Sequence, residues 1–275
     1  MWPLDRAVAS ECLRIGRHTV ERWKSVEGTL SLQSEHALPQ VAAPQPQHLT
    51  GAIKALYSTV PAAPVTLVLE SAWVPVMLVE TGAALLRAAQ VDALVRHRFG
   101  QQYSDGLDPV AAWELRIEHC AGGRYALAYG MTPRLKQTLI DAARAIGLEW
   151  AAMTPALAWG MERLRPSKAL PRPTGWLAWP EQDRTLLVRL ASTEVVGFNA
   201  GAPRVADEAS LLRLIDAESV RLGVQSTSDS FAVATWAPTS RAARAGERVV
   251  WLDARVQGGL SAVPGRSTPI KKVPA

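Results

Sequence analysis

The stretch of residues 125–158 reads YALAYGMTPRLKQTLIDAARAIGLEWAAMTPALA, and its order of elements decides the fold class. Thr132 and Thr154 are N-cap candidates, and each is followed by a proline, which suits the first position of a helix. Gly147 stands where a left-handed residue is expected to end the first of these helices. The stretch therefore predicts strand, helix, strand and helix in succession, a pattern typical of α/β proteins.

The N-terminal part of the chain predicts a three-stranded meander that passes into a short helix and further strands. Its strands are short runs of β-type residues, with turns at Gly16 and Gly28. The predicted order is strands over 11–16, 18–25 and 29–34, a helix near 49–57, strands over 64–71 and 74–80, a helix over about 82–103, and a strand over 111–120.

The C-terminal part repeats this order after a proline-rich connector. Residues 165–175 (RPSKALPRPTG) mark the main boundary between domains. A second meander follows, and then a helix from about Asp207, which caps it, to Leu222. The apolar residues expected to face the sheet from this helix are Leu211, Leu212, Ile215 and Val220.

The composition indicates a globular protein and argues against several classes. Of the 275 residues, 48% are hydrophobic and 20% are charged, which is unlike a disordered chain. The formal charge of +5 is spread along the sequence, so no nucleic-acid partner is expected. Cys12 and Cys120 are the only cysteines, which fits a reducing cytoplasm and gives no zinc-ligand set.

Neither export nor membrane insertion is expected from the sequence. The N-terminus carries Asp5 and Glu11 and has no apolar run of signal-peptide length. The most apolar stretch is interrupted by Glu70, Pro75 and Glu80, so it is too short between these breaks to cross a bilayer. We therefore expect a cytoplasmic protein that reaches a membrane only through a partner.

The common catalytic signatures are missing from the sequence. It has no Gly-x-Ser-x-Gly elbow, Walker loop, His-Glu-x-x-His or paired Cys-x-x-Cys motif. His97, His119 and Cys120 are isolated reactive side chains, for which packing or a solvated face is the simpler interpretation. The sequence therefore predicts no catalytic residue and no metal site.

Both halves open with a meander, and their order and spacing resemble the actin-like ATPase fold. The variant that they resemble is that of the type IV pilus assembly protein PilM and the cytoplasmic part of the type II secretion protein GspL. The resemblance covers about residues 11–238. It implies a two-lobed actin-like (RNase H-like repeated) fold. The implied divisions are a first lobe over 1–164 with a small inserted subdomain at about 73–122, a linker over 165–175, a shortened second lobe over 176–257 and a tail over 258–275.

The resemblance makes LRIGRHTVERWK, residues 13–24, a phosphate hairpin, but the sequence departs from the pattern of ATP-binding members. Such members carry an acid just before the hairpin glycine, where this chain has Arg14 and Ile15. The second hairpin has no glycine in its turn. The resemblance therefore implies a degenerate nucleotide site without ATP or magnesium as an expected cofactor, and its candidate residues are Arg14, Gly16, Arg17, His18, Glu181 and Asp183.

The same resemblance implies a scaffold, a pseudo-ATPase that links a membrane-anchored partner to the assembly ATPase of a pilus or secretion machine. Candidate contacts on the inserted subdomain are Arg87, Arg96 and Gln101, and candidates lining a groove for a partner peptide are Trp176, Trp179 and Trp236. One alternative is an active ATP- and magnesium-binding protein that uses Glu70, Glu181 and Asp183. Another is a basic nucleic-acid-binding module, whose affinity would fall steeply with salt.

Overall fold

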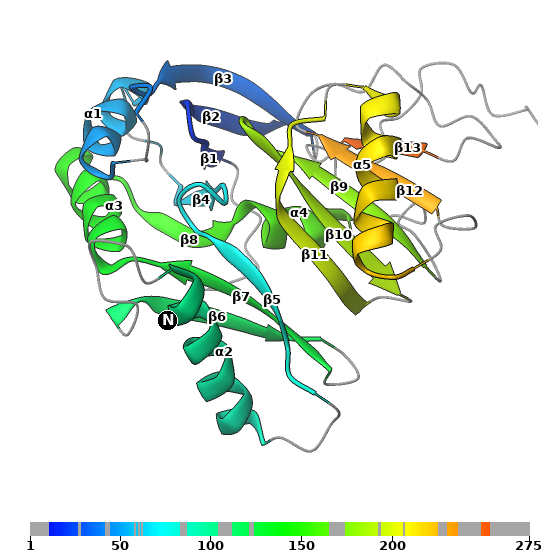
Figure 1. Cartoon of the computed structure of the whole chain (residues 1–275). Coiled ribbons are helices and arrows are strands. Elements are labelled where there is room, and N and C mark those ends of the chain that lie inside the picture. Colours follow the sequence, from blue (N-terminus) through cyan, green and yellow to red (C-terminus); the bar gives the residue numbers. More distant parts are fainter. Residues whose placement is uncertain are drawn as a thin grey trace, which may run out of the picture.

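The structure is a computed structural model of the chain, and the residues that it describes form three β-sheets and five helices (Figure 1). It describes residues 11–26, 29–41, 45–57, 59, 61, 63–82, 87–103, 112–120, 124–164, 174–191, 194–205, 207–224, 230–235 and 249–253.

The first sheet has the strand order β3-β2-β1-β4-β8. An antiparallel meander forms one side of it, and β4 and β8 continue it parallel to β1. Helices α1 and α3 pack against each other beside this sheet (Figure 1). The elements are β1 (Glu11–Ile15), β2 (Thr19–Val26), β3 (Thr29–Ala37), α1 (Gln47–Leu56), β4 (Val65–Leu69), α3 (Pro133–Ile146), β8 (Trp150–Pro155) and α4 (Ala156–Leu164).

The second sheet repeats this arrangement with the order β11-β10-β9-β12-β13. Its first three strands are again an antiparallel meander, and β12 and β13 are again parallel to the first strand. The elements are β9 (Thr174–Pro180), β10 (Arg184–Ala191), β11 (Glu194–Pro203), α5 (Glu208–Arg221), β12 (Ser230–Thr235) and β13 (Val249–Asp253). We call the first sheet with its helices the first lobe, and the second sheet with α5 the second lobe.

A third, smaller sheet has the order β5-β7-β6 and is covered by α2. Its core contains Val95, Phe99 and Trp113, and the rings of Phe99 and Trp113 form a T-shaped contact with their centroids 5.8 Å apart. The elements are β5 (Val76–Glu80), α2 (Ala88–Tyr103), β6 (Glu114–His119) and β7 (Tyr125–Met131). The predicted inserted subdomain ends at about residue 122, but its sheet also includes β7. The exact domain boundaries stay predictions.

The predicted helix ends are set by local chemistry. The Thr132 hydroxyl accepts a hydrogen bond from the Leu135 amide at 3.2 Å, and Gly147 ends α3 at a φ of 70°. Asp207 and Ser210 form a reciprocal capping box at the start of α5. These three predictions are confirmed.

One residue of the predicted buried face of α5 is not buried. Leu211 and Ile215 are buried as expected, but Val220 is 81% exposed. Helical spacing from Ile215 leads to Glu218 and Ser219, which are buried, and Val220 lies past this stripe. The Glu218 carboxylate accepts a hydrogen bond from Asn199 Nδ2 at 2.9 Å, which offsets the cost of its burial.

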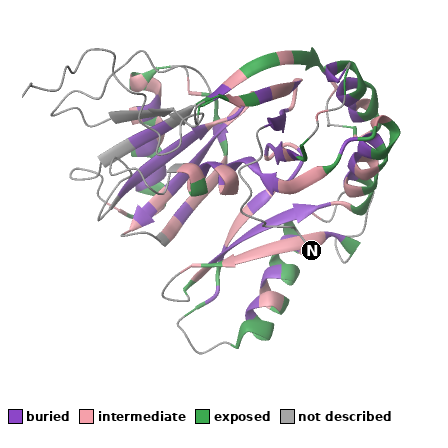
Figure 2. Cartoon of the chain, turned by 180° about the vertical axis from the view of Figure 1, so that it is seen from behind, coloured by how far each residue is buried: buried purple, intermediate pink, exposed green. Residues whose placement is uncertain are grey.

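One apolar cluster contains residues of both lobes. The central strands of the sheets are largely buried (Figure 2). Alternate residues of β9 point to opposite faces of the second sheet. Trp176 and Ala178 pack with residues of α5, whereas Leu177 and Trp179 belong to the same cluster as the first-lobe residues. The lobes are therefore packed together over an apolar face and not only linked by the chain.

Candidate functional site

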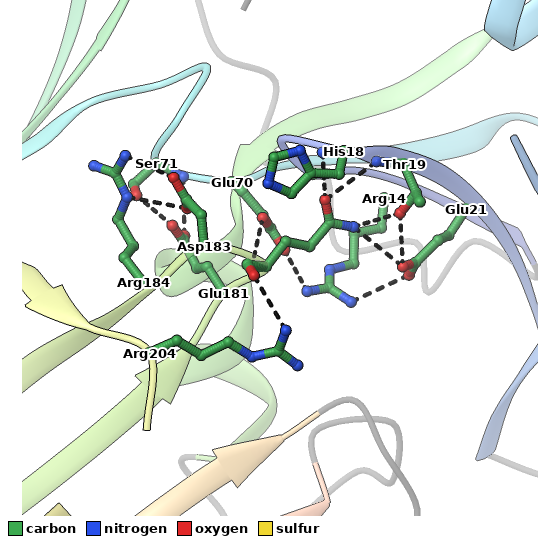
Figure 3. Close-up of polar contacts among 12 residues, drawn as sticks. Arg14, His18, Thr19, Glu21, Glu70, Ser71, Glu181, Asp183, Arg184 and Arg204 are labelled. Carbon is green, nitrogen blue, oxygen red and sulfur yellow. Dashed lines mark hydrogen bonds and ion pairs between the residues drawn. The ribbon is translucent and has the colours of Figure 1, made fainter. Parts of the chain in front are cut away.

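The two lobes present equivalent hairpin turns to each other (Figure 3). In the first hairpin, residues 16–19 join β1 to β2, and the Gly16 amide donates to the Thr19 carbonyl at 2.9 Å. In the second hairpin, residues 181–184 join β9 to β10, and the Glu181 amide donates to the Arg184 carbonyl at 2.8 Å. The same turn therefore recurs at the same place in both meanders.

The side chain of Gln182, from the second hairpin, lies in the first hairpin. Its Oε1 accepts hydrogen bonds from the backbone amides of His18 at 2.6 Å and Thr19 at 3.1 Å. Its Nε2 donates to Thr19 Oγ1 and lies 3.4 Å from Glu21 Oε1. A Cβ added to Gly16 would overlap the Gln182 amide group, so the glycine provides the room for it.

The Arg14 guanidinium is buried beside this contact, between two carboxylates. It pairs with Glu70 and, at 3.1 Å, with Glu21 Oε2. Glu70 directly follows β4 and is fully buried. Burial raises the pKa of Glu70 above its usual range, although the charge of Arg14 opposes this shift. Arg14 thus supplies the positive charge next to these acids.

Glu181 of the second hairpin makes a further contact between the lobes. Its Oε1 accepts a hydrogen bond from the Ser71 amide at 2.9 Å, and the Ser71 hydroxyl donates to its Oε2. Burial, and then the nearby charge of Glu70, raise the pKa of Glu181 to about 8. Glu181 is therefore largely protonated at neutral pH, which limits the negative charge in the site.

Asp183 carries the ion pairs at the margin of the contact. Its Oδ2 lies 3.0 Å from Arg17 Nη1 and 3.0 Å from Arg184 Nη2. The pKa of Asp183 is lowered by hydrogen bonding to Arg184 and by both arginine charges, although burial opposes this. Arg17 joins the lobes here by an ion pair that remains partly exposed to solvent.

The structure brings together all six residues of the predicted degenerate site, which are Arg14, Gly16, Arg17, His18, Glu181 and Asp183. It also adds residues that the sequence analysis did not place there: Thr19, Glu21, Ser71 and Gln182. Gln182 has no motif that marks it. The absence of glycine from the second turn is the one sequence signal that pointed to an altered hairpin.

The residues predicted to bind partners separate into two groups. Arg87, Arg96 and Gln101 are exposed at the start and along the surface of α2. Trp176 and Trp179 do not line a groove, because both are fully buried, and this prediction is corrected. Trp179 packs so closely on α4 that a Cβ on Gly160 would overlap its ring. Trp236 lies outside the described residues.

The described part of the chain has neither a membrane-spanning helix nor a cluster of metal ligands. Within it, no helix is both long and apolar enough to span a membrane. The same residues contain no group of three or more His, Cys, Asp or Glu side chains arranged to hold a metal ion. The chemistry that the site does offer is hydrogen bonding and charge pairing between the lobes.

No protein-family model matches the chain, and no curated protein does. Among solved structures, a Bacteroides thetaiotaomicron protein with actin-like ATPase fold and unknown function is similar at a TM-score of 0.53 and 10% identity, over 84% of this chain and 83% of that chain. The chain has an actin-like ATPase fold. The predicted fold class is thus confirmed.

Two further solved structures resemble the chain. The cytoplasmic domain of EpsL, an inner membrane component of the type II secretion system of Vibrio cholerae, has a TM-score of 0.47 and 12% identity, with 88% of each chain covered. The PilM–PilN type IV pilus biogenesis complex has a TM-score of 0.44 and 12% identity, over 76% of this chain and 68% of that chain. The actin-like fold assignment rests on the Bacteroides structure, whose TM-score is above 0.5.

Proposed function

We propose that this protein is a cytoplasmic scaffold of a type II secretion or type IV pilus-like assembly machine and does not turn over nucleotide. The observation that carries the proposal is the Gln182 side chain in the first hairpin, where it takes the hydrogen bonds of the His18 and Thr19 amides. A phosphate bound by this hairpin needs such amides as donors. With both donors used internally, a nucleotide has to displace a contact between the lobes before it can bind.

The charges around the hairpin support the same proposal. Phosphoryl transfer in nucleotide enzymes needs a magnesium ion held by oxygen ligands near the phosphates. Here the carboxylates of Glu21 and Glu70 are paired with Arg14, a fixed cation inside the protein. A magnesium ion at these carboxylates would have to compete with that buried guanidinium.

The packing between the lobes is a third support. Exchange of a ligand held between two lobes needs a hinge motion that separates them. In this chain Trp179 and Leu177 of the second lobe lie in one apolar cluster with first-lobe residues, and hinge opening would expose them. Two lobes that share an apolar core suit a scaffold better than they suit an enzyme that opens in each cycle.

The assembly machine is proposed from the likeness of the sequence to PilM and GspL. EpsL is an inner membrane component of a type II secretion system, and PilM forms a complex with PilN in type IV pilus biogenesis. By analogy, the partners of this chain are a membrane-anchored assembly protein and the assembly ATPase. The exposed residues Arg87, Arg96 and Gln101 near and along α2 are the proposed contact surface.

Calorimetric titration with ATP and magnesium tests the absence of nucleotide binding. We expect no saturable heat from the native protein, at concentrations where micromolar binding would be measured. Saturable, magnesium-dependent binding would reject the scaffold proposal in favour of an active ATP-binding protein, with Glu70, Glu181 and Asp183 as the first residues to substitute.

Site-specific photo-crosslinking in cells tests the partners. A photoreactive residue at Arg96 on α2 is expected to crosslink to a membrane-anchored assembly protein or the assembly ATPase. The control is the same residue at Gln137, which is exposed on α3. Equal products at both positions, or none from Arg96, would argue against α2 as the contact surface.

A further inference from the structure

The first hairpin binds the Gln182 side chain with hydrogen-bond donors at one end and hydrogen-bond acceptors at the other. We call these groups the Gln182 site, and they are Gly16, His18, Thr19 and Glu21. We infer that the Gln182 site is a receptor for a primary carboxamide and discriminates against oxyanions of the phosphate and carboxylate class. This inference deepens the proposed function and rests on it, since it gives the chemical reason why the hairpin does not take a phosphate.

One end of the Gln182 site donates hydrogen bonds. The backbone amides of His18 and Thr19 converge on a single oxygen, Gln182 Oε1, at 2.6 and 3.1 Å. Two convergent backbone amides bind any small oxygen acceptor, including a phosphate or a carboxylate. By itself, this end does not distinguish a carboxamide from an anion.

The other end of the Gln182 site accepts hydrogen bonds, as the hydrogen bonding of the Thr19 hydroxyl shows. A hydroxyl has one proton, and that of Thr19 is donated to Glu21 Oε1 at 3.1 Å. Thr19 Oγ1 therefore presents a lone pair to the ligand and accepts from Gln182 Nε2. Glu21 Oε1 itself lies 3.4 Å from the same nitrogen, so two acceptors face this end of the ligand.

Hydrogen bonds on the side away from Gln182 fix the orientation of the Glu21 carboxylate. Its Oε2 accepts hydrogen bonds from Arg14 Nη1 at 3.1 Å and from the indole nitrogen of Trp23 at 3.0 Å. These two donors hold the carboxylate in place. The Gln182 site therefore keeps its acceptors whether or not a ligand is present.

A carboxamide matches this arrangement, and an anion of the same shape does not. A primary amide has an acceptor oxygen for the two backbone amides and a donor NH₂ for Thr19 and Glu21. A carboxylate, or a phosphate through its unprotonated oxygens, would place a second oxygen against the Thr19 lone pair and the Glu21 charge. Sites that leave such groups unmatched reject the wrong ligand strongly.

The test removes the internal ligand and offers small molecules in its place. The Gln182→Ala variant loses a group with the size of acetamide, so acetamide, acetate and inorganic phosphate are the probes. Binding is followed by the amide NMR signals of His18 and Thr19 and by the shift of the unfolding temperature. The matched control is Gln137→Ala, which removes an exposed glutamine on α3.

In the Gln182→Ala variant, acetamide is expected to shift the His18 and Thr19 signals and to bind at least about tenfold more tightly than acetate or phosphate. Native protein and the Gln137→Ala variant are expected to show no such shifts. Acetate or phosphate binding as tightly as acetamide would overturn the inference in favour of an anion site. Binding of none of the three probes would show that the site is no receptor without Gln182.

A second variant covers the case in which Gln182→Ala does not fold. Gln182→Glu replaces the amide by a carboxylate of the same shape. We expect it to unfold at a lower temperature than the native protein and to recover as acid protonates the new carboxyl group. A Gln182→Glu protein as stable as the native protein at neutral pH would overturn the inference.

Failure of this inference can be told from failure of the proposed function. ATP binding by the native protein would reject the proposed function, whatever the probes do. A native protein that ignores ATP, combined with a Gln182→Ala variant that prefers acetate or phosphate, would reject only the carboxamide site.

Discussion

The first and second hairpins are the same turn in two lobes, but one receives a side chain and the other supplies it. Both close with the same backbone hydrogen bond, and the shared register aligns Gly16 with Glu181 and Arg17 with Gln182. At the first of these aligned positions, Gly16 has no side chain, whereas Glu181 has a buried carboxyl group that is hydrogen-bonded to Ser71. The repeated backbone therefore fixes where the hairpins meet, and single side chains decide what each of them does.

The Arg14→Asp substitution should weaken the contact between the two hairpins more than any other change. It restores the acid expected before a nucleotide-binding glycine, but it removes the partner of Glu70 and Glu21 and adds a third carboxylate to a buried site. We expect a loss of about 3–5 kcal/mol or more in the free energy of unfolding, measured by urea denaturation. A stable Arg14→Asp protein that binds magnesium and ATP would instead favour the active ATP-binding alternative.

The Gly16→Ala substitution should have the next largest effect, because the added methyl group takes the place of the Gln182 amide. We expect a loss of about 1–3 kcal/mol in the free energy of unfolding. The matched control is Gly51→Ala, since nothing lies within 4 Å of the added Cβ in this exposed helical position. There the change is expected to stabilise by about 0.5–1 kcal/mol. Similar results at both positions would contradict the assigned role of Gly16.

Glu181 makes the contact between the hairpins dependent on pH. Its pKa rises from 4.5 to about 8 in the folded protein, so folding takes up a proton between these values. Its contribution is fully present below pH 4.5 and is lost as the pH rises through 8, with a slope of at most about 1.4 kcal/mol per pH unit. We expect Glu181→Gln to remove this slope and to be more stable than the native protein at pH 9.

Urea denaturation of both proteins between pH 5 and 9 measures this difference. Glu35→Gln, at an exposed position on β3, is the control and should leave the pH profile of the native protein unchanged. A Glu181→Gln profile parallel to the native one would show that another group carries the pH dependence.

The sequence predicted those parts of the fold that short-range chemistry determines. Thr132, Gly147 and Asp207 act on residues within a few positions along the chain, so their helix ends were readable without a structure. Residues 11–34 likewise contain the short β-type runs and the turns of their own meander. The prediction that Val220 is buried was wrong, because the buried stripe that passes through Ile215 continues at Glu218, whose carboxylate is buried and hydrogen-bonded.

The candidate site was predictable only in part, since its contacts join distant segments. The resemblance to actin-like proteins pointed to both hairpins and the missing acid, and it named Arg14 and Glu181 among the candidate residues. In the structure Glu70 lies beside both of them. Gln182 was missed because its hydrogen-bond partners lie 163 and 164 positions away in the sequence. No local pattern distinguishes such a glutamine from one in an exposed turn. Only the packing of the two lobes gives it a role.

The ion pair between Arg17 and Asp183 should contribute least to the contact between the hairpins. Its atoms lie 3.0 Å apart, but both side chains remain partly exposed, so water and salt screen the attraction. A double-mutant cycle of Arg17→Ala and Asp183→Asn is expected to give a coupling of about 0.2–1 kcal/mol that falls as salt is added. Arg184 also pairs with Asp183 and will hold that carboxylate when Arg17 is removed, which reduces the coupling further. A large, salt-independent coupling would mean that the hairpins are held together at their margin and not by the buried contacts of Gln182 and Arg14.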